Sequence, residues 1–310
     1  MTRGLASEMR LPGFDELPLR SGDPKGSAWG LWGPDDELGT LNLITNEVTQ
    51  LALHEAKLGR VVNLNLPLNV PLKPMNPRRK PCAHNLIAKG LANDDELDFN
   101  TQSSSHWDGL RHYPYTETKQ FYNGVLQGEI ATTKKLGIQN MAQKPIVTRG
   151  GIELRPFTNQ PIRLNELLDI AREQQVIFRP GDVLVIRTGW TDAYFKLSDV
   201  EKRHLGGRDD RASCGVEATE AAIRWHWENG FAAVASDTVA YEAWPSPKPW
   251  GVCMHEVFLS GWGMPIGECW DLEELSQTCR ELGRWTFLLT SQPLNLPGGV
   301  ASPPNACAVF

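Results

Sequence analysis

The sequence predicts a single α/β domain, because short apolar strand-like runs alternate with segments of helical period along most of its 310 residues. The apolar runs at 183–186 and 231–235 are bounded by turn residues, which is typical of buried strands. Helical period is clearest over 164–174 and 272–282. The chain contains no internal repeat, no low-complexity tract and no linker that would divide it cleanly.

The first 25 residues are expected to form a flexible or surface-hugging lead-in, and residues 26–310 the domain. The lead-in is rich in Pro, Gly and Asp, and residues 1–18 lack the hydrophobic core of a signal peptide. The six cysteines include no CxxC pair, which is typical of reduced thiols in an intracellular protein. We therefore expect a cytoplasmic protein.

The segment before the middle of the chain begins with a helix predicted over 46–58, between a threonine N-cap and a terminating glycine. Residues 61–66 alternate like a strand, and the Pro-rich, basic stretch 67–81 is typical of a surface loop. Residues 97–99 are strand-like again.

The second half of the chain alternates regularly between helix and strand. Helices are predicted over 164–174, 216–228 and 272–282. Buried strands are predicted over 183–186, 231–235 and 285–289. The last four residues, 307–310, formally fit a prenylation box, but no basic cluster precedes them, and a closing β-strand is the preferred interpretation.

The composition limits the possible partners. The formal net charge is −6, whereas a nucleic-acid-binding protein would need a basic face. No apolar run approaches the roughly 18 residues that a membrane span requires. We therefore expect a small-molecule substrate, with no nucleic-acid or membrane partner.

The eleven residues from Gln102 to His112 concentrate side chains that can bind a metal ion. His106 and Asp108 are two apart, so in an extended backbone both point the same way. Gln102 could reach the same cation from the preceding turn, and His112 from the following one. The pattern predicts a metal centre and favours a hydrolase.

A second cluster of polar residues runs from His255 to Glu268, and both are candidate ligands or ligand-orienting groups. The eleven tryptophans favour an aromatic-walled pocket and an aromatic substrate, because several flank these candidates. The tryptophans expected at such a wall are Trp107, Trp250, Trp262 and Trp270.

The first cluster resembles the signature of the cyclase family, whose best-known members are the bacterial kynurenine formamidases. That signature has the form His-x-Gly-Thr-His-x-Asp-x-Pro-x-His. His106, Asp108 and His112 match it, Gln102 stands where the first histidine belongs, and Leu110 replaces the proline. The resemblance continues over most of the chain after about residue 85, and the long N-terminal part indicates a divergent branch.

The resemblance implies a central mixed β-sheet flanked by helices, and a homo-oligomer. It also implies that His106 and Asp108 are metal ligands, that His112 is the catalytic base or acid, and that His255 and Glu268 belong to a second metal position. A metal-activated water would then hydrolyse an amide, formamide or lactone carbonyl.

The departure at Gln102 affects the choice of metal. A carboxamide binds through a neutral, hard oxygen, so Gln102 as a ligand would weaken a zinc site and favour Mn²⁺ or Mg²⁺. We expect a divalent ion, Mn²⁺ or Zn²⁺, with Mn²⁺ slightly favoured.

Two other functions fit parts of the sequence. His-x-Asp with a distant histidine also occurs in iron(II)/2-oxoglutarate oxygenases, and His204 and Arg211 imitate the downstream part of that pattern. The interval between this histidine and this arginine is short for the oxygenase pattern. Alternating helices and strands also do not suit the all-β double-stranded helix of such oxygenases. A non-catalytic binding protein on a hydrolase scaffold is the other alternative, favoured by the missing first histidine.

Overall fold

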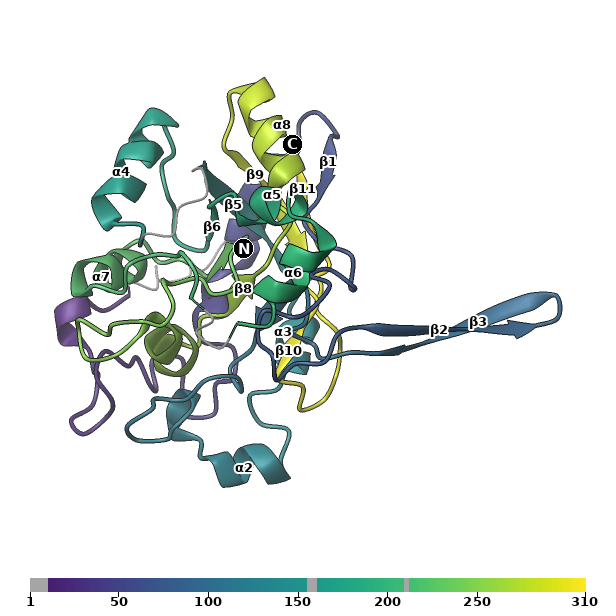
Figure 1. The fold of residues 1–310 in the computed structure, drawn as a ribbon. Helices are drawn as coiled ribbons and strands as arrows, with labels where there is room; N and C mark the ends of the chain where they lie inside the picture. Colours follow the sequence, from purple (N-terminus) through teal and green to yellow (C-terminus); the bar gives the residue numbers. More distant parts are fainter. Residues whose placement is uncertain (1–10, 155–160, 209–211) are drawn as a thin grey trace, which may run out of the picture.

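One large mixed β-sheet forms the centre of the molecule (Figure 1). The computed structural model describes residues 11–154, 161–208 and 212–310. Within these ranges the sheet has nine strands, in the spatial order β1 (Val61–Asn63), β11 (Ala306–Val309), β9 (Thr286–Ser291), β5 (Ile146–Leu154), β6 (Val183–Arg187), β7 (Ala233–Ser236), β8 (Ile266–Glu268), β4 (His106–Asp108) and β10 (Ala301–Ser302). Strands β5 to β8 run parallel to one another, and the other pairs are antiparallel.

Helices surround this sheet, which confirms the predicted α/β class with a mixed central sheet. The α-helices are α1 (Asn46–Leu53), α2 (Gln127–Thr132), α3 (Ile138–Gln143), α4 (Leu164–Glu173), α5 (Trp190–Phe195), α6 (Asp199–Leu205), α7 (Glu220–Glu228) and α8 (Glu273–Leu282). Short 3₁₀ segments are η1 (Phe14–Glu16), η2 (Gly39–Leu43) and η3 (Tyr122–Gly124), and η4 (Glu256–Trp262) is a π-helix. No helix in the described ranges is both long and apolar enough to cross a membrane.

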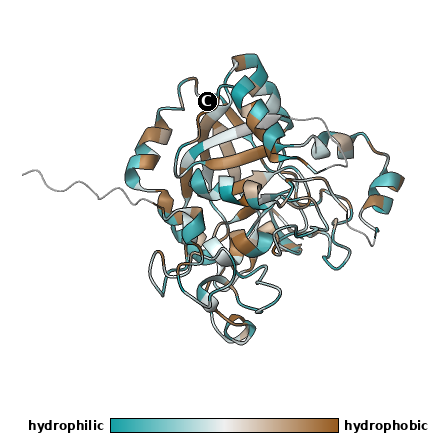
Figure 2. Ribbon diagram, turned by 90° about the vertical axis from the view of Figure 1, so that its left-hand side faces the viewer, coloured by the Kyte–Doolittle hydropathy of each residue, from teal (hydrophilic) through white to brown (hydrophobic). Residues whose placement is uncertain are grey.

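Both faces of the central strands are buried, which explains their unbroken apolar sequences. Successive side chains of a strand point to opposite faces. In β6, Leu184 and Ile186 belong to a core that also contains residues of α4 and α7. Val183 and Val185 belong to the opposite core, together with residues of α8. Figure 2 shows these hydrophobic strands in the middle of the body, with helices of mixed hydropathy around them.

The predicted elements agree with the structure in kind, and some differ in length. The first helix ends at Leu53 rather than 58, because the amides of Leu58 and Gly59 donate to the carbonyl of Phe310 at the sheet. The helix predicted from 216 begins only at Glu220, since Val216 pairs with the 241–243 segment through backbone hydrogen bonds. The predicted closing strand is confirmed as β11, with Phe310 fully buried behind it.

Residues 11–25 pack on the body. Phe14 is buried, Asp15 pairs with Arg224 of α7, and the Pro12 carbonyl accepts a hydrogen bond from the Trp227 indole. These contacts place this part of the expected lead-in against the body. Residues 1–10 lie outside the described ranges, and the division of the chain at residue 25 stays a prediction.

A second, two-stranded sheet forms a hairpin that projects from the body (Figure 1). Its strands are β2 (Ala83–Lys89) and β3 (Ala92–Asp98), joined by Gly90 and Leu91. Gly90 has a φ of 72°, as the first central position of a tight hairpin turn requires. The strand-like segment at 97–99 is the end of this hairpin, which leads directly back to Gln102.

Candidate metal centre

Strand pairing brings the two sequence clusters together. In the antiparallel pair β4–β8, His106 lies opposite Glu268. His106 and Asp108 occur on the same face of β4, as their spacing predicts. All three side chains are buried, and one ligand atom from each lies within 4.8 Å of the others. The three could therefore hold one ion between them.

The hydrogen bonds of His106 indicate which of its nitrogens faces this centre. Its Nδ1 lies 2.7 Å from the Ser104 carbonyl oxygen, which can only accept, so Nδ1 carries the proton. Nε2 lies 3.5 Å from Asp108 Oδ1 and 3.3 Å from Glu268 Oε2, and among the described residues it has no hydrogen-bond partner. Both distances exceed those of a charge-assisted hydrogen bond, about 2.7–2.9 Å. Nε2 and two carboxylates thus face one another at distances longer than good hydrogen bonds, an arrangement that a cation between them would stabilise.

His255 approaches the same centre from the other side of Glu268. Its Nε2 lies 3.1 Å from Glu268 Oε1, and its Nδ1 lies 2.8 Å from Glu242 Oε1. Glu242 also accepts the backbone amides of Met254 and His255. Burial opposes protonation of the His255 ring, but the hydrogen bonds to Glu242 and Glu268 outweigh it and raise the pKa of His255 to about 10.

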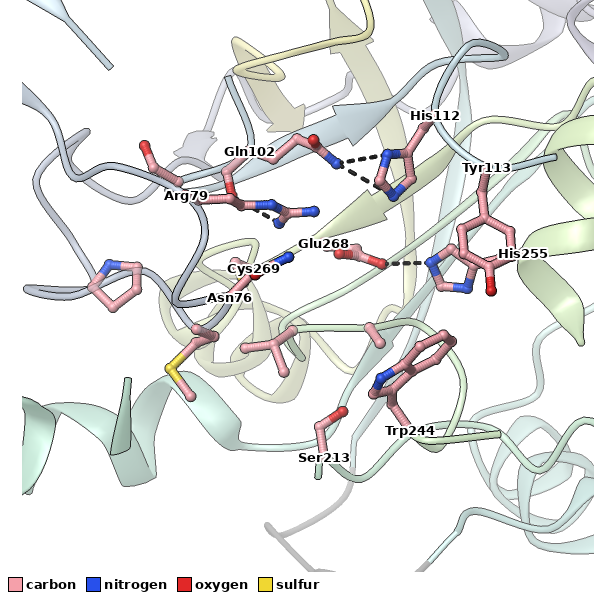
Figure 3. Close-up of a pocket in the computed structure, with 15 residues that line it drawn as sticks. Asn76, Arg79, Gln102, His112, Tyr113, Ser213, Trp244, His255, Glu268 and Cys269 are labelled. Atoms are coloured by element: carbon pink, nitrogen blue, oxygen red, sulfur yellow. Dashed lines mark hydrogen bonds and ion pairs between the residues drawn. The ribbon is translucent and has the colours of Figure 1, made fainter. Parts of the chain in front are cut away.

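Gln102 points its amide nitrogen toward this centre. Its Nε2 lies 2.6 Å from Asp108 Oδ1. The same nitrogen lies 3.1 Å from His112 Nδ1, the contact drawn in Figure 3. An ionised carboxylate can only accept, so the atom facing Asp108 has to be the donating nitrogen. Metal ligation through the Gln102 oxygen would require the amide to turn over.

His112 lies between the buried centre and an open cavity. Its Nε2 is 3.4 Å from Asp108 Oδ2, and its side chain keeps 21% of its surface exposed. Burial lowers the pKa of His112, and the opposing charge of Asp108 does not cancel the effect. The ring is therefore neutral near pH 7 and can accept a proton.

A cavity of about 200 Å³ opens above Glu268 and His112. Tyr113 and Trp244 form an aromatic wall, with ring centroids 6.3 Å apart and each ring in contact with His255 (Figure 3). Arg79 and Asn76 line the cavity as well.

The predicted aromatic pocket is present, but the predicted tryptophans do not line it. Trp107, Trp262 and Trp270 are fully buried in the core, and Trp250 packs on Phe14. Trp107 lies between His106 and Asp108 on β4 and points to the opposite face, because successive side chains of a strand alternate.

Sequence reasoning also missed several residues at this site. Tyr113 directly follows the motif and could have been included for that reason. Glu242 and Trp244 lie in a loop thirteen and eleven residues before His255, without a periodic pattern that would relate them to it. Arg79 belongs to the basic stretch 67–81, for which the sequence predicts only a surface loop.

The chain belongs to the cyclase family. The family model named Cyclase matches residues 44–243. A crystal structure described as a novel cyclase is 31% identical, with a TM-score of 0.80, covering 92% of this chain and 99% of its own. No functionally curated protein shows significant similarity to the sequence.

Two isatin hydrolases have a similar fold. Isatin hydrolase A from Labrenzia aggregata, bound to benzyl benzoate, is 17% identical with a TM-score of 0.55, covering 85% of this chain and 98% of its own. Isatin hydrolase A from Ralstonia solanacearum is 16% identical with a TM-score of 0.52, covering 81% and 92%. At such identities the likeness concerns the fold alone.

Proposed function

We propose that this protein is a metal-dependent hydrolase that acts on an amide, formamide or lactone carbonyl. One observation carries the proposal: the unpartnered Nε2 of His106 faces Asp108 and Glu268 beneath a cavity that His112 enters from the side. A buried cation site next to a neutral histidine and a substrate-sized space is the arrangement that hydrolysis needs.

The buried groups fit a divalent ion. His106, Asp108 and Glu268 would hold it. His255, hydrogen-bonded to Glu242 and Glu268 through its two ring nitrogens, would orient Glu268, and it could join the ion only after losing the proton on Nε2. One nitrogen and two carboxylates suit Mn²⁺ or Zn²⁺, and the oxygen-rich set slightly favours Mn²⁺. Gln102 holds Asp108 and His112 in place through its amide nitrogen. The bound ion would supply Lewis-acid activation of water and of the substrate carbonyl.

The chain's own residues would perform the proton transfers. His112 accepts the proton of the attacking water, because its ring is neutral and reaches both the cavity and Asp108. As the carbonyl carbon gains the water oxygen, the bond to the leaving nitrogen or oxygen breaks. His112 then returns the proton to that leaving atom, so the imidazole ends the cycle unchanged.

The oxygenase alternative is not favoured. The sheet is mixed and flanked by helices, unlike an all-β double-stranded helix. His204 lies on α6, a helix without buried residues, and Arg211 lies outside the described ranges.

A substrate screen tests the proposal. Formanilide, isatin (the compound in the names of two structural neighbours) and dihydrocoumarin would be incubated with protein loaded with Mn²⁺ or Zn²⁺, and with EDTA-treated protein. We expect turnover that requires metal. His106→Ala should lose both metal and activity, whereas His112→Ala should keep the metal and lose activity by about 10²–10⁴-fold.

The matched control is His204→Ala, an exposed histidine remote from these groups in sequence, which should leave both properties unchanged. Full activity of metal-loaded His112→Ala would refute its role as proton carrier. Absence of stoichiometric metal after loading would instead favour a non-catalytic binding protein.

A further inference from the structure

Arg79 is the one arginine or lysine among the described residues that line the cavity above the metal centre. In Figure 3 its guanidinium extends into the cavity from the wall opposite His255, Tyr113 and Trp244. The mechanism proposed above does not use it.

A tight turn sets the position of Arg79. The Arg79 amide donates to the Asn76 carbonyl oxygen at 2.9 Å, and Pro77 occupies the second turn position, where its fixed φ is favoured. The Asn76 side-chain oxygen accepts the amide of Arg78 at 3.1 Å. The turn directs Arg79 inward and leaves Arg78 exposed. The amide nitrogen of Asn76, at the cavity wall, donates no hydrogen bond to the part of the chain that the structure describes.

The guanidinium is only partly used within the protein. Its Nη1 donates to the Gln102 carbonyl oxygen at 3.0 Å. In the part of the chain that the structure describes, no carboxylate lies within 4.0 Å of it. A guanidinium carries five N–H donors in a planar fork, so several of them remain for a ligand in the cavity.

An arginine at this place is unfavourable for a metal site unless it meets an anion. Its positive charge opposes the binding of a cation nearby. It also acts on His112, since after burial and the opposing charge of Asp108 it is a further cause of the lowered pKa. A substrate carboxylate would neutralise this charge and match the planar fork with two parallel hydrogen bonds.

We propose that Arg79, assisted by Asn76, binds a carboxylate group of the substrate and thereby selects anionic over neutral substrates. The inference rests on the proposed hydrolase function and names its substrate class: a single-ring aromatic amide or formamide that carries a carboxylate. Tyr113 and Trp244 supply the wall for the ring. The size agrees, because a cavity of about 150 Å³ already admits benzene, and this one measures about 200 Å³.

A matched pair of substrates tests the proposal. N-formylanthranilate and 2-formamidobenzamide share the ring and the reacting formamide, and differ in a carboxylate against a carboxamide. We expect the wild type to prefer the carboxylate at least about tenfold in kcat/KM. Arg79→Gln should bring the ratio of the two kcat/KM values close to one, mainly through a higher KM for the carboxylate. Arg79→Lys should retain part of it, because the charge remains and the fork is lost.

The control is Arg78→Gln, the same chemical change one residue away on the exposed side of the turn, which should behave as the wild type. Calorimetric titration of anthranilate into EDTA-treated protein supplies a measurement independent of turnover, and binding should depend on Arg79. Unchanged selectivity in a folded Arg79→Gln variant would overturn the inference and leave Arg79 as a structural contact to Gln102.

The two proposals fail in different ways. Hydrolysis of both formamides at equal rates would contradict the proposed preference for anionic substrates but would support the hydrolase function. If anthranilate binds in a way that depends on Arg79 but neither formamide is hydrolysed, the anion site would be supported and the hydrolase function contradicted.

Discussion

At the scale of single residues, Glu242 determines the orientation of the His255 ring and raises its pKa. The Glu242 carboxylate is fully buried, and it accepts hydrogen bonds from the His255 ring nitrogen Nδ1 and from two backbone amides. Partners of this kind orient a metal-binding histidine, and their loss costs about 10–100-fold in metal affinity or activity. Glu242 thus acts as a positioning residue.

We predict that Glu242→Gln lowers Mn²⁺ affinity or kcat/KM by about tenfold or more, because a neutral amide no longer fixes the His255 ring. Metal titration followed by calorimetry and steady-state kinetics would measure both quantities. The control Glu228→Gln, at an exposed position of α7, should change neither. Equal metal affinity and activity in both variants would show that His255 needs no such partner.

A second buried histidine makes stability depend on pH. In α7, His226 Nδ1 donates to the Ala222 carbonyl and Nε2 accepts from the Tyr241 hydroxyl, and burial lowers the pKa of His226 to about 4. The folded ring stays neutral, whereas the unfolded ring binds a proton below about pH 6.5. Its contribution to stability is therefore complete above pH 6.5 and is lost as the pH falls toward 4.

The expected loss attributable to His226 is about 3 kcal/mol between pH 6.5 and 4. Urea denaturation of EDTA-treated protein at several pH values would measure it. His226→Gln should be less stable at pH 7 and should show a shallower decline toward acid. The exposed His54→Gln should follow the wild type. Parallel pH curves for the wild type and His226→Gln would contradict the assignment.

At the scale of elements, the hairpin β2–β3 and the strand β11 contribute very differently to stability. Both strands of the hairpin are almost entirely exposed, and a two-stranded hairpin alone is at best marginally stable. Strand β11 instead lies between β1 and β9 inside the sheet, with Phe310 fully buried after it.

We predict that replacing residues 84–97 by a two-glycine turn changes the Tm by less than about 3 °C, since Ala83 and Asp98 are already paired neighbours and little apolar core is lost. Phe310→Ala should cost about 3–5 kcal/mol, because it leaves a cavity in the core. Thermal unfolding would compare the two variants. A large loss on trimming would indicate that the hairpin packs on another chain, a result relevant to the predicted homo-oligomer.

At the scale of the whole molecule, Asp108 and Glu268 are buried together beside His106, and a divalent ion bound between them would offset their mutual repulsion, so metal binding should stabilise the fold. A ligand at 100 times its Kd that binds only the folded state adds about 2.7 kcal/mol. For a chain of this size, we predict that Mn²⁺ raises the Tm of EDTA-treated protein by several degrees. His106→Ala should show no such shift, and a wild type equally insensitive to Mn²⁺ and Zn²⁺ would argue against the metal centre.

The sequence by itself determined the features that depend on local geometry. The α/β class followed from apolar runs and helical periods, because burial imposes these patterns directly on the chain. The shared direction of His106 and Asp108 followed from strand geometry. Lengths were less predictable: the first helix stops at Leu53 because backbone amides beyond it bind to the distant Phe310.

Tertiary structure alone decided which distant residues meet. Glu268 faces His106 only because β8 pairs with β4 in one register, and a shift by one residue would turn its side chain away. Glu242 reaches His255, and Arg79 reaches the cavity, through loops whose course depends on the packed body. Their positions depend on long-range contacts, and these leave no periodic pattern in the sequence.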